Sequence, residues 1–318
     1  MVDITQTADL SVIVTVIDGV ESLTRCLDAL AAHEGAQRLE VIIPFDDTIA
    51  AVGGLAVQYP EYVFLNLGVL ADRPPRNAFD EHVLLDRRRA GGLCAATAEL
   101  LAMIEDRGWP HPNWAQAMIG LHRANPHPAI GGAVFNAAPT PMLNAVFKCD
   151  YGRSEPPAET SEREYLTDIN ICYKRAALMQ IRDLWREEYH EVTVNDALKK
   201  NDGKLLFSSA PVVSMQRRPR PVAELLKERF YWGRIVARIR VENLPRAAGL
   251  KFAALSPALP LVLSYRIFRL HRQKGRSVKV FLWQLPPLFL LLTFWSLGEC
   301  SGYIRASFLK ASGDNSKN

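Results

Sequence analysis

The sequence predicts an α/β fold over about its first two thirds, followed by a helical region that associates with a membrane. Short β-branched runs alternate with amphipathic segments as far as residue 215, uncharged apolar runs follow, and the charge changes sign between the two parts. Hydrophobic residues make up 48% of the 318 residues and charged residues 23%, with 19 Gly and 20 Pro. This composition excludes collagen-like, disulfide-scaffold and wholly disordered chains.

The first elements follow one another in a βαβαβ order. Residues 10–16 are a short β-branched apolar run, which predicts a strand. The next helix is indicated by an apolar stripe at helical spacing, made of Leu23, Cys26, Leu27 and Leu30. Residues 39–43 predict a second strand, 49–58 a helix and 62–66 a third strand. Strands joined by helices imply parallel pairing with right-handed crossovers.

Polar residues follow the first two predicted strands. Thr15 and Asp18 come at and after the end of the first, and Asp46 and Asp47 come after the second. In sheets of this kind, ligands bind beyond the carboxyl ends of the strands. We therefore expect this edge to bind a nucleotide.

Charged residues also surround the next predicted strand. Residues 87–93 (RRRAGGL) predict the start of a helix, and residues 99–104 predict a strand that ends at Glu105 and Asp106. Two carboxylates at a strand end can hold Mg²⁺ or Mn²⁺, because these cations prefer oxygen ligands and leave positions for phosphates. The arginines that begin at Arg87 are suited to the same phosphates. Taken singly, the acidic pair is also consistent with a solvated helix cap, and the arginine run with an ordinary surface.

Further along, residues 109–114 predict the start of another helix and residues 191–200 a helix headed by Glu191. The five cysteines are odd in number and never form a C-x-x-C pair. This pattern argues for a reducing compartment and against a zinc site or redox dithiol. The first ten residues show no basic segment followed by an apolar one, so we expect no cleaved secretory signal and a cytoplasmic first domain.

The net charge of +4 conceals a strong asymmetry. Residues 1–215 hold 19 Lys and Arg against 29 Asp and Glu, whereas residues 216–318 hold 19 against 5. An acidic part and a basic part do not serve the same partner. We therefore expect two domains, 1–215 and 216–318, and nothing in the basic part indicates nucleic-acid binding.

Two uncharged apolar runs lie in the basic part. Residues 280–298 approach the roughly 20 residues needed to cross a bilayer, whereas residues 252–265 fall in the range of about 10–14 that indicates a buried, re-entrant or interfacial helix. The segment between them is basic, and two full crossings would place it on the side opposite the first domain, against the positive-inside rule. We expect either a hairpin that enters from the cytoplasmic face or one span at 280–298. The alternative is a buried helical hairpin of a soluble protein.

Residues 221–241 show helical periodicity with several Lys and Arg residues available for a polar face. A basic amphipathic helix beside apolar runs predicts a membrane-surface element, since anionic headgroups attract such a face. A helix that packs on the first domain, with its charges solvated, is the alternative.

Several of these segments form an ordered set of motifs. In chain order they are residues 10–14 (LSVIV), 40–43 followed by Asp46-Asp47, 87–93, 104–106 with the Pro-x-Pro-x-Trp of 110–114, 168–178 (DINICYKRAAL) and 189–198 (YHEVTVNDAL). The set resembles the family-2 glycosyltransferases of the GT-A fold over about residues 10–215. Residues 230–234 (FYWGR) and 298–303 (GECSGY) are similar to the membrane-associated tail of some such enzymes. The resemblance implies a Rossmann-like mixed sheet.

The resemblance also implies roles for individual residues. Asp46 and Asp47 would contact the base and ribose of a nucleotide sugar, and Thr15, Asp18, Arg87 and Glu105 would complete the donor site. Glu105 and Asp106 would hold Mg²⁺ or Mn²⁺ against the diphosphate. Members of this kind invert the anomeric carbon, which requires a base for the acceptor hydroxyl. Glu191 is the candidate base, with His190 and Asp196 as alternatives.

The chain departs from the family pattern at three points. Arg107 occupies the third acidic position of the metal motif, and Val192 follows Glu191 where the family has an acidic pair. The tail also lacks the Gln-x-x-Arg-Trp element of polymerising synthases, which favours transfer of a single sugar.

The sequence thus predicts an inverting, metal-dependent glycosyltransferase at the cytoplasmic face of the plasma (inner) membrane, anchored by its C-terminal helices. Its partners would be a nucleotide-sugar donor and a saccharide or lipid-linked acceptor, in polysaccharide or glycolipid biosynthesis. One alternative is a catalytically silent adaptor of a polysaccharide-assembly complex. Another is a nucleotidyltransferase, which the single Gly19 after the first strand disfavours because a phosphate-binding loop needs several glycines.

Overall fold

The computed structural model describes residues 8–75, 78–138, 140–200, 203–241 and 244–314. The chain forms two compact units. One consists of residues 1–137 and 154–218 and is called the sheet unit below; the other consists of residues 138–153 and 219–318 and is called the helical unit. Residues 1–7, on which the expectation of no secretory signal rests, lie outside the described residues.

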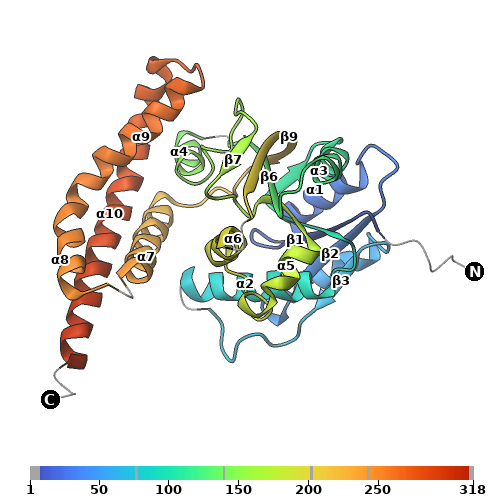
Figure 1. Cartoon of the computed structure of the whole chain (residues 1–318), viewed down its shortest axis with the longest axis horizontal. Coiled ribbons are helices and arrows are strands. Elements are labelled where there is room, and N and C mark those ends of the chain that lie inside the picture. The colour runs from blue at the N-terminus through green and yellow to red at the C-terminus, as the bar shows by residue number, and fades with distance from the viewer. Residues whose placement is uncertain (1–7, 76–77, 139, 201–202, 242–243, 315–318) are drawn as a thin grey trace, which may run out of the picture. The chain divides into compact units, whose positions relative to one another are not determined.

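The sheet unit contains one mixed sheet (Figure 1), with the strand order β3-β2-β1-β4-β8-β6-β9-β5 and β7 paired to β9. Strands β1 to β4 are parallel, β8 runs antiparallel to both β4 and β6, and β6 is parallel to β9. The strands are β1 Leu10–Thr15, β2 Leu39–Phe45, β3 Val63–Asn66, β4 Leu100–Glu105, β5 Gly108–Pro110, β6 Ala129–Asn136, β7 Ser161–Arg163, β8 Asn170–Lys174 and β9 Leu205–Met215. The predicted α/β class with a mixed sheet is confirmed.

Helices cover both faces of this sheet. They are α1 Val20–Ala31, η1 Asp47–Val57, α2 Ala78–Ala95, α3 Trp114–Ala124, α5 Arg175–Gln180, η2 Arg182–Leu184 and α6 Glu191–Lys200. Alternate residues of β1 enter different cores: Val12 and Val14 pack in the cluster that includes α1 and α3, whereas Ile13 packs in the cluster that includes α2, α5 and α6. The predicted stripe on α1 is buried at all four positions.

The helix start predicted at 87–93 is wrong, whereas the start predicted at 109–114 lies only at the last residue of that segment. Residues 87–93 lie inside α2, which already begins at Ala78. Asp80 and Glu81 are in its first turn, where acidic side chains stabilise the helix by interacting with the positive end of its dipole. Residues 108–110 form strand β5, which pairs with β9, and α3 begins only at Trp114. In both cases the predicted helix exists, but its first residue was misplaced: α2 begins before residues 87–93, and α3 begins at the end of residues 109–114.

The helical unit is built around its last helix. Its elements are α4 Pro141–Asp150, α7 Val222–Val241, α8 Arg246–Leu255, η3 Ser256–Ala258, α9 Leu259–Gln273 and α10 Val278–Asp314. Leu143 and Val146 of α4 pack with Leu225 of α7 and Leu291 of α10. The buried Arg229 of α7 donates to both carboxylate oxygens of Asp150, at 2.5 and 2.6 Å. The sequence did not indicate that residues 138–153 join these helices.

Two segments of the helical unit, Arg246–Gln273 and Val278–Phe308, are long and apolar enough to cross a membrane. The first combines α8, η3 and α9 and is twice as long as the run 252–265, because the charged flanks continue the helix. Only 28% of each apolar window is buried in the protein, whereas the core helix of a soluble protein is mostly buried. Among the apolar side chains exposed here are Trp283 at 80% and Leu261 at 67%.

Candidate functional site

The carboxyl ends of three parallel strands meet at one edge of the sheet. Thr15 ends β1 and is in register with Glu105 at the end of β4, and Asp46 follows the end of β2. The N–H of Asp106 donates to the Thr15 carbonyl at 2.9 Å, which holds the two strand ends together. The Thr15 hydroxyl oxygen is buried and has no hydrogen-bond partner among the described residues. This edge therefore offers polar groups, as the sequence predicts.

Asp106 closes the turn between β1 and α1. Its Oδ2 atom accepts the backbone N–H groups of Asp18 and Gly19, both at 2.9 Å, and Gly19 adopts the left-handed φ of 95° that glycine tolerates. Burial raises the pKa of Asp106 to about 7, against a lowering effect of the neighbouring Arg107. Its second oxygen is buried and has no hydrogen-bond partner among the described residues. One oxygen of Asp106 is thus structural and the other is available to a cation.

Asp18 and Arg107 form an ion pair at the same turn. Arg107 Nη2 lies 3.1 Å from Asp18 Oδ1, and the other oxygen of Asp18 accepts the N–H of Arg218 at 2.8 Å. Arg107 is buried, so it places a positive charge next to the carboxylates of this edge.

Asp46 is fully buried and bound to Arg88 of α2. Arg88 Nη2 lies 2.8 Å from Asp46 Oδ1, and the Thr48 hydroxyl donates to the same oxygen at 2.7 Å. Asp46 Oδ2 is buried and has no hydrogen-bond partner among the described residues. Asp47, in contrast, is exposed, and Arg87 is exposed and donates to the Leu70 carbonyl at 2.6 Å. Of the three consecutive arginines, only Arg87 therefore faces solvent.

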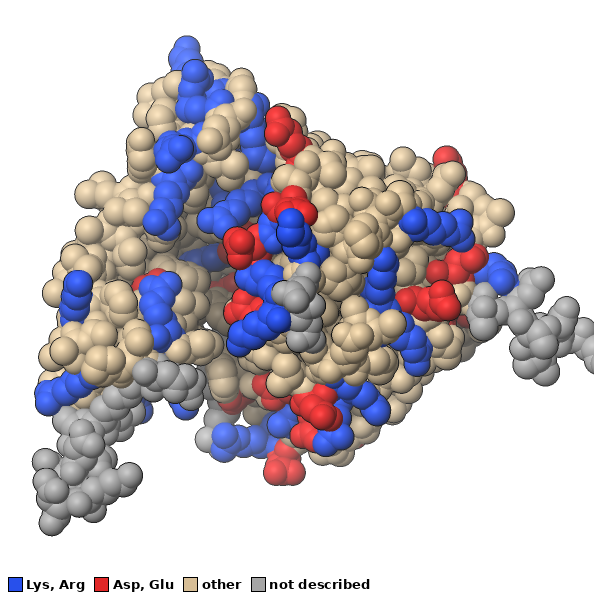
Figure 2. All heavy atoms as spheres, in the orientation of Figure 1, with Lys and Arg blue, Asp and Glu red and all other residues tan. Residues whose placement is uncertain are grey.

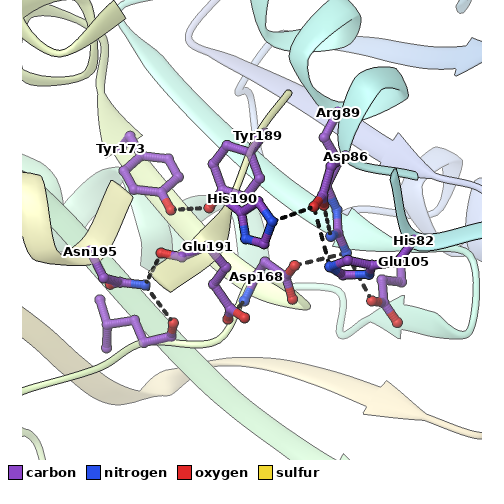
Figure 3. Close-up of polar contacts among 11 residues, drawn as sticks. His82, Asp86, Arg89, Glu105, Asp168, Tyr173, Tyr189, His190, Glu191 and Asn195 are labelled. Atoms are coloured by element: carbon purple, nitrogen blue, oxygen red, sulfur yellow. Dashed lines mark hydrogen bonds and ion pairs between the residues drawn. The ribbon is translucent and has the colours of Figure 1, made fainter. Parts of the chain in front are cut away.

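Arg89 connects three carboxylates inside the sheet unit (Figure 3). Its guanidinium nitrogens lie 3.0 Å from Asp86, 3.1 Å from Glu105 and 2.8 Å from Asp168. The four side chains are almost entirely buried. Burial is the main cause that raises the pKa of Asp86 to about 7 and that raises the pKa of Glu105. One guanidinium thus contacts three buried carboxylates, so the cluster holds more acidic groups than this single positive charge can neutralise.

Glu191 is the first residue of α6 and lies beside this cluster. Its Oε1 atom accepts the N–H of Asp168 at 2.7 Å, and the Tyr165 hydroxyl also donates to its carboxylate. Burial and then the nearby Asp168 carboxylate raise the pKa of Glu191 well above its ordinary value. A carboxylate with a raised pKa is a stronger base once it has lost its proton.

His190 points to Asp86 and not to Glu191 (Figure 3). Its Nε2 atom lies 3.8 Å from Asp86 Oδ2, and His82 Nε2 lies 3.2 Å from the same oxygen. Burial lowers the pKa of His82 to about 3, so its imidazole is neutral at neutral pH. His82, Asp86 and His190 form the one group of three or more metal-ligating side chains found within ligand distance among the described residues. Glu105 and Asp106 do not belong to that group.

The structure thus places Thr15, Asp18, Asp46, Glu105 and Asp106 on three adjacent strand ends, and Glu191 near Glu105 through Asp168 and Arg89. Sequence reasoning assigned no role to Asp86, and it included Asp168 only in the 168–178 motif. It assigned the arginines that begin at Arg87 to phosphate, whereas the structure pairs Arg89 of that run with carboxylates. His82 and Asp86 are four residues apart on α2, so they share a helix face, but the helix was predicted to start only at residue 87 and their spacing was therefore not recognised.

Comparison by sequence found no matching family model and no matching curated protein. Among solved structures, the chain is similar to GalNAc-T7 crystallised with UDP, GalNAc and Mn²⁺, at 11% identity and a TM-score of 0.46, over 67% of this chain. The chain spans 45% of the length of that GalNAc-T7 chain. It is also similar to residues 1–349 of Staphylococcus aureus TarS in complex with UDP-GlcNAc, at 13% identity and a TM-score of 0.47, over 96% of this chain and 92% of that one.

Proposed function

We propose that the sheet unit transfers a sugar from a nucleotide-diphospho-sugar to an acceptor hydroxyl, with inversion at the anomeric carbon and Glu191 as the base. The observation that carries the proposal is the buried carboxylate cluster at the carboxyl edge of the sheet, with Glu191 held next to it by the Asp168 N–H. In this arrangement one Glu191 oxygen is held by the backbone. The other oxygen takes the proton of the acceptor hydroxyl as that oxygen attacks the sugar.

The donor would bind at the ends of β1, β2 and β4. Asp46 Oδ2 and the Thr15 hydroxyl are buried polar atoms without a hydrogen-bond partner among the described residues, as expected of groups that meet a ligand. Arg87 is exposed and can reach phosphate, whereas Arg88 and Arg89 orient Asp46 and Glu105. These residues would bind and orient the nucleotide.

Glu105 and Asp106 fit a Mg²⁺ or Mn²⁺ ion by their chemistry. Each has one buried carboxylate oxygen without a hydrogen-bond partner among the described residues, and oxygen ligands are those that both cations prefer. When bound, the cation would neutralise the charge that develops on the leaving diphosphate. The buried Arg107 beside them adds a fixed positive charge to the same edge.

We further propose that residues 216–318 anchor the chain at the cytoplasmic face of the plasma membrane, near a lipid-linked or membrane-proximal acceptor. Exposed apolar residues of α9 and α10 and exposed arginines of α9 support this anchor, and Figure 2 shows Lys and Arg side chains gathered over α9. Such a combination suits a membrane with anionic headgroups. The pathway would be polysaccharide or glycolipid biosynthesis.

A thermal-shift screen of the full chain in detergent tests the proposed donor site. UDP, GDP and dTDP sugars are compared with and without Mg²⁺ or Mn²⁺, starting with UDP-GlcNAc. We expect one nucleotide class to raise the melting temperature only with metal, because a ligand that binds only the folded state stabilises it. Asp46→Asn is expected to lose the shift, whereas Glu187→Gln, at an exposed position, keeps it. No shift and no transfer from any nucleotide sugar would support the adaptor instead.

A further inference from the structure

A group of three side chains lies beside the proposed base but is not used by it. His82 and Asp86 stand one turn apart on α2, and His190 comes directly before α6. Their nearest ligand atoms all lie within 4.8 Å of one another. Figure 3 shows both imidazoles directed at the same Asp86 carboxylate. Two distant segments of the chain therefore converge on one point.

The carboxylate at the centre of the group is held in place. Asp86 Oδ1 accepts from Arg89 Nη1 at 3.0 Å, and the Asp86 carbonyl accepts the N–H of Tyr189 at 3.1 Å, which holds the segment before His190 against α2. Asp86 is 1% exposed, and its Oδ2 atom has no hydrogen-bond partner among the described residues, although two ring nitrogens lie at 3.2 and 3.8 Å. A buried oxygen that faces two nitrogens in this way is suited to share a cation with them.

The donor set indicates which cation would bind. Two imidazole nitrogens and one carboxylate suit borderline transition metals such as Zn²⁺ or Co²⁺, whereas Mg²⁺ prefers oxygen ligands alone. Ligands at about 2.1 Å from a tetrahedral ion lie about 3.4 Å apart, so the widest pair of this group needs to close by up to about 1.4 Å. The imidazoles of His82 and His190 are 24% and 40% exposed, which leaves a side open to solvent.

We propose that His82, Asp86 and His190 form a binding site for a borderline divalent transition metal, separate from the oxygen-ligand site at Glu105 and Asp106. Arg89 acts on this site by orienting the Asp86 carboxylate, as hydrogen-bonded groups behind metal ligands commonly do. The absence of Cys pairs argued against zinc in the sequence, but this site uses no cysteine. It stands whether or not the chain transfers a sugar. Occupancy would fix His190 and, through it, the start of α6 at Glu191.

Cobalt binding to the full-length protein in detergent tests this site directly. The protein is stripped with EDTA and titrated with Co²⁺, followed by calorimetry and by visible absorption, which reports nitrogen ligands of the ion. We expect one equivalent to bind, Zn²⁺ to displace it and excess Mg²⁺ to leave it in place. His82→Ala and His190→Ala are each expected to weaken binding at least 10-fold, whereas His33→Ala, at the end of α1, is the matched control.

Two further comparisons distinguish this proposal from its alternatives. Glu105→Gln combined with Asp106→Asn is expected to keep the cobalt spectrum, even though it removes the oxygen ligands of the proposed donor site. The His190→Ala variant, whose side chain is partly exposed, is checked for unchanged circular dichroism so that lost binding is not lost folding. Absence of stoichiometric binding to the wild type, or binding by both histidine variants as tight as that of the wild type, would overturn the proposal. Failure of sugar transfer would not affect it.

Discussion

In the sheet unit the charged side chains at the strand ends are buried and paired, whereas on α9 and the start of α10 they are exposed beside exposed apolar residues. Arg89 contacts three buried carboxylates, while Arg266 and Arg269 face solvent on the same helix as the exposed Leu261. Burying a charge is costly unless partners compensate it, so a buried cluster indicates a role in chemistry or precise structure. Exposed charges beside an exposed apolar surface instead indicate a role in attaching the protein to a membrane or a partner.

The largest effect that could break this comparison is loss of membrane attachment. Deletion of residues 219–318 is expected to abolish flotation of the chain with lipid on a density gradient, because both apolar segments and 17 of the 38 Lys and Arg residues are removed. Flotation separates membrane binding from aggregation, since aggregates sediment. A truncated chain that still floats with lipid would show that the anchor lies within residues 1–218.

The next effect concerns the buried charges of the sheet unit. Arg89→Met leaves Asp86, Glu105 and Asp168 buried without their common partner, and breaking a buried pair in this way costs about 3–5 kcal/mol. Urea unfolding measures the change in the free energy of unfolding. The matched substitution Lys199→Met removes an ion pair whose acidic partners are exposed, and we expect a change below about 1 kcal/mol. Equal costs for both variants would contradict the comparison.

A smaller effect is the expected loss of free energy of unfolding as the pH is lowered. Burial lowers the pKa of His122 from 6.5 to about 4, and its Nε2 atom lies 3.1 Å from the Cys172 carbonyl. The unfolded chain therefore binds a proton that the folded chain excludes, so stability is lost as the pH falls from about 6.5 towards 4. At pH 5 the loss from this residue is about 2 kcal/mol.

Unfolding of the wild type and of His122→Gln at pH 8 and pH 5 checks this expectation. Gln keeps an N–H for the Cys172 carbonyl but does not titrate, so the variant is expected to lose less stability between the two pH values. If both proteins lose the same amount, His122 is not the buried group responsible.

The sequence predicted those features that are determined by residues close together in the chain, but not the contacts between residues far apart in it. The apolar stripe of α1 and the start of α6 at Glu191 follow from local periodicity, and both were found at the predicted residues. The contacts of Arg89 with Glu105 and Asp168 join residues 16 and 79 positions apart, and no local pattern distinguishes Arg89 from Arg87. For the same reason α4 could not be assigned to the helical unit, since its partners lie in α7 and α10.

The most direct measurement of the central claim is the rate of nucleoside diphosphate release with acceptor present, for the wild type, Glu191→Gln and the control Glu187→Gln. If Glu191 is the base, its Gln variant still binds the donor but turns over about 10²–10⁴ times more slowly, the usual contribution of general base catalysis. Because burial raises the pKa of Glu191, wild-type turnover is also expected to rise with pH as its carboxyl loses the proton. A Glu191→Gln enzyme that works at the wild-type rate, with the same pH profile, would contradict the account.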